Sequence, residues 1–216
     1  MRNKEKDEAL KAIRREQAIE AGFRLFAERG IDTVTMPDIA EASGVGRPSL
    51  FRYFSTKLDL VVAIGVWKWE AYFRESAERV PAEALANMSA KEHLAYYLDS
   101  FVDLYRNHRD VLRFNYFFNA YVQETHAPKE QLRSYLEMVG ALLEGFHAVY
   151  QKALEDGTVR TDLSEAAIAS GVLHIMLSAT TRYAAGLVYT IEGNDPEDEL
   201  VLLRNALLRE YATNCA

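Results

Sequence analysis

The stretch TMPDIAEASGVGRPSLFRYFSTK, residues 35–57, decides the fold of this chain. Thr35 supplies the hydroxyl of a helix N-cap, and Pro37 in the next turn favours a helix that begins there. Gly44 permits the sharp turn that ends this first short helix. A second short helix is predicted from about Arg47 to Phe54. Two short helices that meet at a tight glycine turn are typical of a helix-turn-helix.

The two short helices divide into an inward and an outward face. The residues expected to pack inward are small or apolar: Ile39, Ala40, Val45 and Leu50. The residues left facing outward on the second helix are Arg47, Pro48, Ser49, Arg52 and Tyr53. Guanidinium groups bind phosphate or the edge of guanine, and a proline ring can contact a thymine methyl. This outward face is therefore a candidate DNA-contacting surface.

Helical periodicity extends outward from this stretch over the rest of the chain, and no strand pattern is found. Helices are predicted at about 13–29, 36–42, 47–54, 57–79, 89–107, 109–124, 129–155, 164–188 and 197–212. Residues 81–87 are interpreted as a connection. We therefore expect an all-α protein of about nine helices. A three-helix head over residues 1–57 would precede a helical bundle over residues 58–216, for ligand binding and dimerisation.

Charge and composition narrow the class of protein. The net charge is −7, but Lys and Arg outnumber Asp and Glu by 11 to 9 through Lys57, whereas the rest has 14 against 23. An acidic body with a mildly basic head is compatible with DNA contact at the head. The charged N-terminus is unlike a secretory signal, and no apolar run is long enough to span a bilayer. The single cysteine, Cys215, cannot build a disulfide framework or a cysteine-rich metal site. We expect a cytoplasmic protein without cofactor, metal or membrane partner.

Three segments together carry a resemblance to a known family. AIEAGFRLFAERG at residues 18–30, TMPDIAEASGV at 35–45 and SLFRYFSTK at 49–57 resemble the tetracycline-repressor (TetR) family, and the similarity covers about residues 13–64. The resemblance implies an all-α homodimer whose two heads place recognition helices in successive major grooves of DNA. It also implies that the start of the first short helix, Tyr53 and Lys57 meet phosphate. The bases would be approached by Arg47, Pro48 and Ser49. The predicted DNA-binding set is Thr35, Met36, Gly46, Arg47, Pro48, Ser49, Arg52, Tyr53 and Lys57.

Gly46 departs from the family pattern, which often has a hydroxyl residue at this position. Glycine caps a helix nearly as well. What glycine lacks here is only the phosphate or base contact that a hydroxyl would make.

The body of the chain is rich in aromatic residues, which either fill a core or line a cavity. The resemblance implies a pocket for an inducer, apolar or aromatic in character. The candidate lining residues are Phe101, Tyr105, Phe117, Tyr121, Met138, Leu142 and His174. For His174, which sits in an apolar stretch, a histidine buried in the core is the alternative.

The last two helices carry apolar faces broader than one packing side of a monomer needs. The candidate dimer residues are Leu173, Leu177, Ala184, Leu200, Leu203, Leu207 and Tyr211. The resemblance implies that two copies of this helix pair form a four-helix interface. Ligand binding in the body would then move the helix that begins near Lys57 and change the spacing of the two heads.

The sequence thus predicts a ligand-responsive regulator, expected to be a repressor, that binds a palindromic operator as a homodimer and is released by a small effector. The alternatives are a DNA-binding regulator without effector, an adaptor that has lost DNA binding, and a helical-bundle enzyme. The last rests on one Glu-x-x-His pattern, Glu144 with His147, which di-iron bundles use twice. No second pair is found, so an enzyme is not expected.

Overall fold

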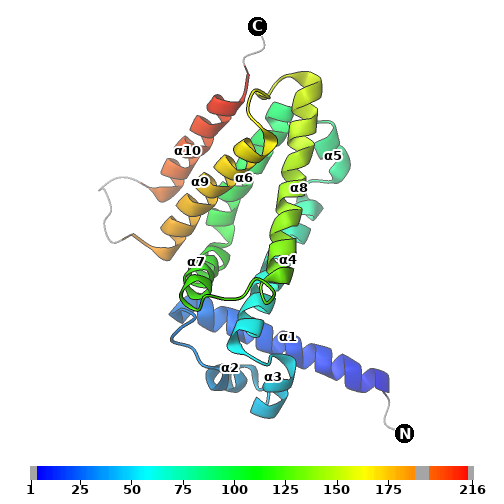
Figure 1. Ribbon diagram of the computed structural model, residues 1–216, viewed down its shortest axis with the longest axis vertical. Coiled ribbons are helices and arrows are strands. Elements are labelled where there is room, and N and C mark those ends of the chain that lie inside the picture. The colour runs from blue at the N-terminus through cyan, green and yellow to red at the C-terminus, as the bar shows by residue number, and fades with distance from the viewer. Residues whose placement is uncertain (1–3, 188–194, 214–216) are drawn as a thin grey trace. The chain divides into compact units, whose positions relative to one another are not determined.

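The computed structural model describes residues 4–187 and 195–213, leaving out the side chains of residues 4, 5, 141 and 142. Val188, at the expected end of one helix, and Cys215 lie outside the described residues. The helices are α1 (Lys4–Arg29), α2 (Met36–Ser43), α3 (Arg47–Tyr53), α4 (Lys57–Arg79), α5 (Ala82–Ala86), α6 (Ala90–Asn107), α7 (Arg109–Glu124), α8 (Arg133–Asp156), α9 (Glu165–Ala185) and α10 (Pro196–Tyr211) (Figure 1).

The all-α prediction is confirmed, since the described residues contain ten helices, nine of them with seven or more residues, and no strand. The additional helix is α5, which lies where the sequence indicated only a connection. It is a single turn after Pro81, and five residues are too few to show a helical period in a sequence. In addition, α1 begins at Lys4 rather than near Ile13, and α8 begins at Arg133 rather than at residue 129.

The chain forms two compact units that are not continuous in sequence. Unit 1 comprises Met1–Glu70 and Arg113–Leu136, and unit 2 comprises Ala71–Leu112 and Glu137–Ala216. The predicted boundary at residue 57 therefore differs from this division. The start of α4 and most of α7 belong to unit 1 with the first three helices.

Unit 1 is built around a helix-turn-helix that packs on α1. The side chains of Phe26, Ile39 and Leu50 are completely or almost completely buried. A Cβ atom at Gly22 of α1 would lie only 2.8 Å from Cδ1 of Ile64, so α1 and α4 approach closely at this point. Gly30 ends α1 at a φ of +83°, in the left-handed region that favours glycine.

Unit 2 is a helical bundle in which α6, α9 and α10 pack against one another (Figure 1). Its core includes Leu98 of α6, Met176 of α9 and Leu200 of α10, each fully buried. The helix starts follow local chemistry. Ser89 accepts a hydrogen bond from the backbone of Glu92, whose carboxylate accepts one from Ser89, which is the capping box that the sequence predicts.

None of the helices in residues 4–187 and 195–213 has the length and apolar character needed to cross a membrane.

Candidate nucleic-acid interface and ligand groove

The start of α2 is fixed by a reciprocal cap. The backbone N–H of Thr35 donates to Oδ2 of Asp38 at 2.8 Å, and the backbone N–H of Asp38 donates to Oγ1 of Thr35 at 3.3 Å. These hydrogen bonds, the backbone one first, lower the pKa of the Asp38 carboxyl from its ordinary value. At the other end, Gly44 takes a φ of +67°, which turns the chain into α3. The motif is thus rigid at both ends of α2.

The outward face of α3 carries two exposed guanidinium groups. Arg47, Pro48 and Arg52 are exposed, as the sequence predicts, whereas Ser49 and Tyr53 are half-buried. The Nη2 atom of Arg52 donates to Oγ of Ser49 at 3.0 Å, so this arginine is held along the helix. The inward face is also as expected, because Val45 and Leu50 are buried.

Two residues of the predicted DNA-binding set have a different environment. The side chain of Met36 is only 7% exposed and points into the core, so Met36 can offer a ligand only its backbone. The hydroxyl of Thr35 donates to Asp38 at 2.8 Å within the cap, although Thr35 itself is exposed. Gly46 is exposed and precedes α3 with no side-chain cap.

Phe51 was not predicted as part of this face, yet 48% of its surface is exposed. It lies four residues after Arg47 and three after Pro48 on α3, and residues at these spacings share one side of a helix. The helical period could have identified it.

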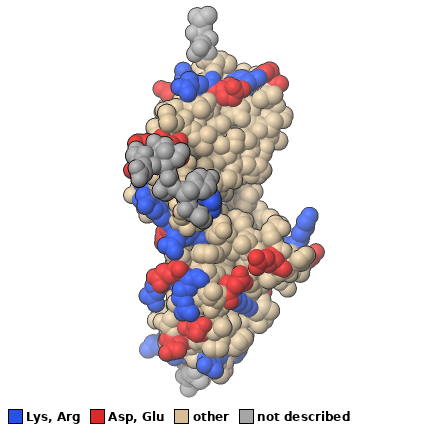
Figure 2. Space-filling view, turned by 90° about the vertical axis from the view of Figure 1, so that its left-hand side faces the viewer, with Lys and Arg blue, Asp and Glu red and all other residues tan. Residues whose placement is uncertain are grey.

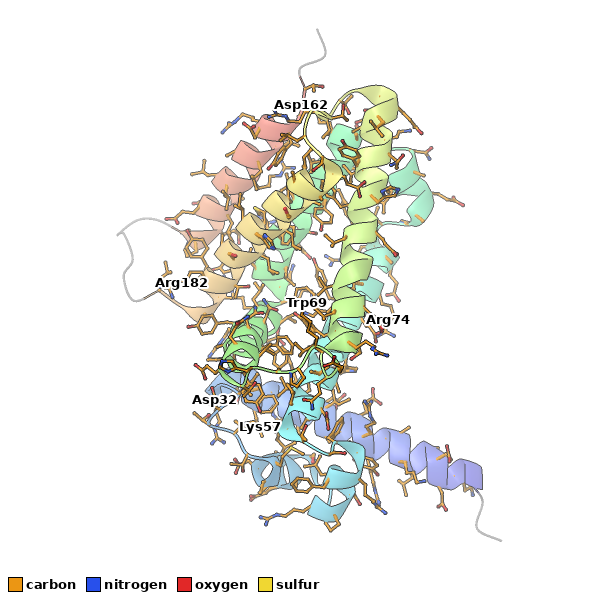
Figure 3. The ribbon with its side chains drawn as sticks, in the orientation of Figure 1. Asp32, Lys57, Trp69, Arg74, Asp162 and Arg182 are labelled. Atoms are coloured by element: carbon orange, nitrogen blue, oxygen red, sulfur yellow. The ribbon has the colours of Figure 1, made fainter. Side chains whose placement is uncertain are left out.

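Lys57, a predicted phosphate contact, is held among aromatic rings at the start of α4 (Figure 3). Its Nζ atom lies 5.4 Å from the ring centroid of Tyr121 and 5.9 Å from that of Phe26. Burial lowers the pKa of the ammonium group, and the nearby carboxylate of Asp32 opposes this shift. Lys57 is therefore only partly available to a phosphate.

The residues predicted to line a ligand pocket do not form one group. Phe101, Tyr105 and Met138 are buried in unit 2, whereas Phe117 and Tyr121 belong to unit 1. His174 is exposed on α9, so neither the pocket nor the alternative of a core histidine holds for it. The side chain of Leu142 lies outside the described residues. None of the other six lines the cavities described next.

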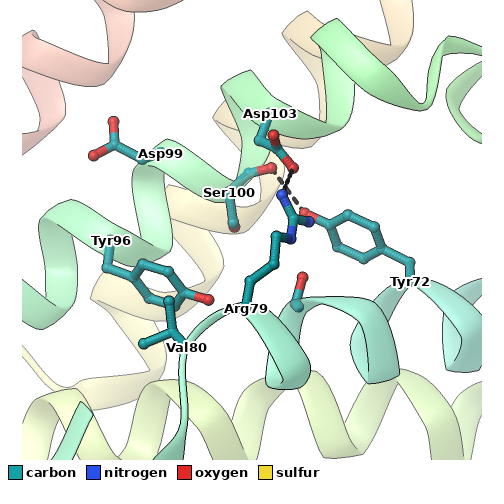
Figure 4. A pocket seen from close by; sticks show the side chains of 8 residues that line it. Tyr72, Arg79, Val80, Tyr96, Asp99, Ser100 and Asp103 are labelled. Atoms are coloured by element: carbon teal, nitrogen blue, oxygen red, sulfur yellow. Dashed lines mark hydrogen bonds and ion pairs between the residues drawn. The ribbon is translucent and has the colours of Figure 1, made fainter. Parts of the chain in front are cut away.

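Unit 2 has two adjoining cavities. The larger, of about 380 Å³, is lined by residues of α4, α5, α6 and α8: Phe73, Ser76, Ala77, Val80, Ala82, Leu85, His93, Tyr96, Tyr97 and Gly145. The smaller, of about 210 Å³, is lined by Tyr72, Ser76, Arg79, Val80, Tyr96, Asp99, Ser100 and Asp103 (Figure 4). Both include Ser76, Val80 and Tyr96, so we treat them as one groove with an apolar arm and a polar end.

The charged groups at the polar end are already paired. The Nη1 atom of Arg79 lies 2.7 Å from the Asp103 carboxylate, as Figure 4 shows. Asp99 points away from this pair and accepts two hydrogen bonds of 2.7 Å from Arg204 of α10. The Tyr72 hydroxyl donates to the backbone oxygen of Ser100 at 2.9 Å.

A second region of unit 2 has unpaired apolar surface, on α9 and α10. Of the predicted dimer residues, Leu200, Leu207 and Tyr211 are buried in the chain's own core and cannot form a surface. The others are half-buried: Leu173, Leu177, Ala184 and Leu203.

Two apolar side chains outside the predicted dimer set are more exposed than these four residues: Ile175 is 42% exposed and Leu202 is 66% exposed. Figure 2 shows a broad area of unit 2 without Lys, Arg, Asp or Glu. The α9 helix has none of these residues over positions 166–181. The unpaired surface of this helix pair is therefore uncharged along most of α9.

The residues that suggested an enzyme do not assemble into a metal site. Glu144 is exposed on α8, and the Nδ1 atom of His147 lies 2.9 Å from the carboxylate of Glu165 of α9. Within the part of the chain that the structure describes, no group of three or more His, Cys, Asp or Glu is arranged to hold a metal ion.

Comparison with known proteins agrees with this architecture. Residues 18–64 match the family described as "Bacterial regulatory proteins, tetR family". The chain is 44% identical over 50 residues to the HTH-type transcriptional regulator TtgR of Pseudomonas putida. It is 39% identical over 51 residues to the HTH-type transcriptional activator FasR of Mycolicibacterium smegmatis. The TtgR match covers 23% of this chain and 24% of TtgR, and the FasR match covers 24% of this chain and 23% of FasR. The chain therefore spans about a quarter of the length of either relative.

Solved structures extend the similarity to the whole fold. A transcriptional regulator from Saccharomonospora viridis, in complex with choline, has a TM-score of 0.73 at 16% identity. The alignment covers 93% of this chain and 98% of that protein. At this identity the likeness shows the fold and not the ligand.

The matching head sequence and the shared fold lead to one conclusion. The head of the chain, residues 18–64, is that of the TetR family of transcriptional regulators.

Proposed function

We propose that the protein is a repressor that binds a palindromic operator as a homodimer through α3, and that a small molecule bound in unit 2 releases it. The observation that carries the proposal is the outward face of α3, where Arg47 and Arg52 are exposed on a motif whose helix ends are fixed by caps. An exposed cationic edge on a rigid helix is what base and phosphate contact requires. Two heads about 34–36 Å apart would match one turn of DNA.

Arg47 and Lys57 play different parts in this proposal. Arg47 is exposed at the first turn of α3, where it can reach base edges, whereas the partly available ammonium group of Lys57 at the start of α4 would contact phosphate. A base contact discriminates between sequences, and a phosphate contact acts on all of them alike. The contributions of Arg47 and Lys57 to DNA binding can therefore be separated by experiment.

We expect Arg47→Ala to weaken binding to the operator by roughly 1–3 kcal/mol and to lower sequence discrimination. Lys57→Ala should weaken binding to all DNA alike and flatten the dependence of the affinity on salt concentration. The operator is first identified by genomic footprinting with the purified protein, and titrations at several salt concentrations then compare it with scrambled DNA. Arg24→Ala, which removes an exposed arginine from α1 outside the motif, is the control. Unchanged affinity in both test variants would contradict the proposal.

The groove between α4, α5, α6 and α8 is the site that we propose for the effector, in place of the residues proposed from the sequence. Its larger cavity, of about 380 Å³, lies within the size range of small-molecule pockets. If bound ligand moves α4, whose first residue is Lys57, the spacing of the two heads would change. Operator affinity that is the same with and without saturating ligand would remove this switch and leave a regulator without effector.

A further inference from the structure

The groove in unit 2 contains polar side chains that have no partner in the protein. Over the described residues, neither the hydroxyls of Tyr96 and Tyr97 nor the ring of His93 makes a hydrogen bond to another group. All three line the larger cavity. His93 lies four residues before Tyr97 and three before Tyr96 on α6, so the three side chains form one contiguous patch. Polar groups that face a cavity without a partner are available to a bound molecule.

These polar groups are uncharged. Burial raises the pKa of the Tyr97 hydroxyl to about 12, so it stays protonated and can donate a hydrogen bond. Burial also lowers the pKa of His93 from its ordinary value, so its ring is neutral at pH 7. The patch therefore offers hydrogen bonds and no net charge.

The rest of the groove favours a molecule without charge as well. Arg79 is paired with Asp103, and Asp99 is paired with Arg204. A charged ligand would have to break one of these pairs or lose its hydration without compensation. The arm beyond the patch is apolar, with Phe73, Val80 and Leu85 among its lining residues. Covering this apolar surface with hydrocarbon removes it from water, which favours binding.

We propose that the groove binds an uncharged, mostly hydrocarbon molecule with one hydroxyl or carbonyl oxygen, which hydrogen-bonds to the patch formed by His93, Tyr96 and Tyr97. The inference deepens the proposed effector role and rests on it for its biological meaning. The binding itself can be measured in the absence of DNA.

Three probes of the same ring size separate the charge classes: 1-naphthol, 1-naphthoate and 1-naphthylmethylamine, which are neutral, anionic and cationic at pH 7. Calorimetric titration of the full chain should show that 1-naphthol binds at least tenfold more tightly than the other two. The proposal of an uncharged ligand would be overturned if 1-naphthoate or 1-naphthylmethylamine bound more tightly than 1-naphthol. It would also be overturned if none of the three probes bound. Operator release is measured separately, so binding without release would contradict the effector role alone.

A matched pair of glycines on α8 locates the site. Gly145 lines the groove, whereas Gly140 does not, and a Cβ atom at either position meets nothing within 4 Å. Gly145→Leu should therefore fill the groove and weaken 1-naphthol binding at least tenfold, and Gly140→Leu should leave it unchanged. Ala77→Phe fills the groove from α4 and provides a second test if Gly145→Leu does not fold. Equal binding by a folded filling variant and the natural protein would place the ligand elsewhere.

The hydrogen-bonding patch has its own test. Tyr97→Phe and His93→Phe keep a ring and remove the polar atoms, and each should weaken 1-naphthol binding about fivefold, the effect of one typical hydrogen bond. Tyr150→Phe is the control, because its hydroxyl donates to the backbone oxygen of Leu163 outside the groove. Binding that both patch variants leave unchanged would overturn the assignment of the polar end.

Discussion

The carboxylate of Asp38, in the cap at the start of α2, makes the stability of the fold depend on pH. Because its pKa is lower in the folded chain than its ordinary value of 3.8, this group stabilises the fold above that value. The stabilisation is lost as the pH falls through the folded pKa. We expect the natural protein to be more stable than Asp38→Asn at about pH 6, and the difference to vanish in strong acid. Thermal unfolding across this range measures it.

Glu41→Gln is the control for this prediction, since Glu41 is an exposed carboxylate on the same helix outside the cap. A constant stability difference between the natural protein and Asp38→Asn at every pH would show that the cap does not depend on the charge.

Individual side chains were predictable where local geometry decides their direction. Arg47 and Leu50 follow from the helical period alone, since one faces outward and the other into the core. Met36 is in the predicted DNA-binding set, but its side chain is buried, because its direction at the start of α2 depends on packing against other helices. The ring of Tyr121 that contacts Lys57 belongs to a segment 64 positions further along the chain. No local pattern reports such a contact.

At the scale of elements, the link between α1 and α2 depends on Gly30. Its φ of +83° is costly for a residue with a side chain, and a Cβ atom would lie 3.3 Å from Cε1 of Phe117. Gly30→Ala should therefore destabilise the chain by about 1–2 kcal/mol. Gly145→Ala, within α8 and in open space, should instead stabilise it by about 0.5–1 kcal/mol. Urea unfolding compares the two, and a Gly30→Ala variant as stable as the natural protein would contradict this account.

The elements themselves were largely predictable, and the cavity that they enclose was not. Caps such as Thr35 and Ser89 mark helix starts within a few residues of sequence, which is why most boundaries agree. The aromatic residues Phe101 and Tyr105 looked like pocket candidates, but both are buried in unit 2 and line neither cavity of the groove. Gly145 lines the groove, and a Cβ atom there would meet nothing within 4 Å. Space between helices is a property of packing and not of the local pattern.

At the scale of the whole molecule, the proposed repressor needs two copies, because one head contacts only half of a palindrome. The surface available for this lies on α9 and α10, where Leu173, Leu177 and Leu203 are half-buried. Leu202 of α10 and Ile175 of α9 are more exposed than these three leucines. Exposed apolar side chains on neighbouring helices are typical of a surface that another chain covers. We therefore propose that Leu202 and Ile175 take the place of Leu200 and Leu207 in the predicted interface.

This revised interface predicts the oligomeric state of a charged variant. Leu202→Glu would bury a carboxylate without a partner between two copies, so we expect the dimer to dissociate to chains of 24.5 kDa. Leu154→Glu changes a leucine of similar exposure on α8 and should leave the mass unchanged. Sedimentation equilibrium measures the mass, and operator titration should show weaker, non-cooperative binding for Leu202→Glu alone. A Leu202→Glu protein that remains dimeric would place the contact on another surface, because no well-packed interface accepts an unpaired charge at its centre.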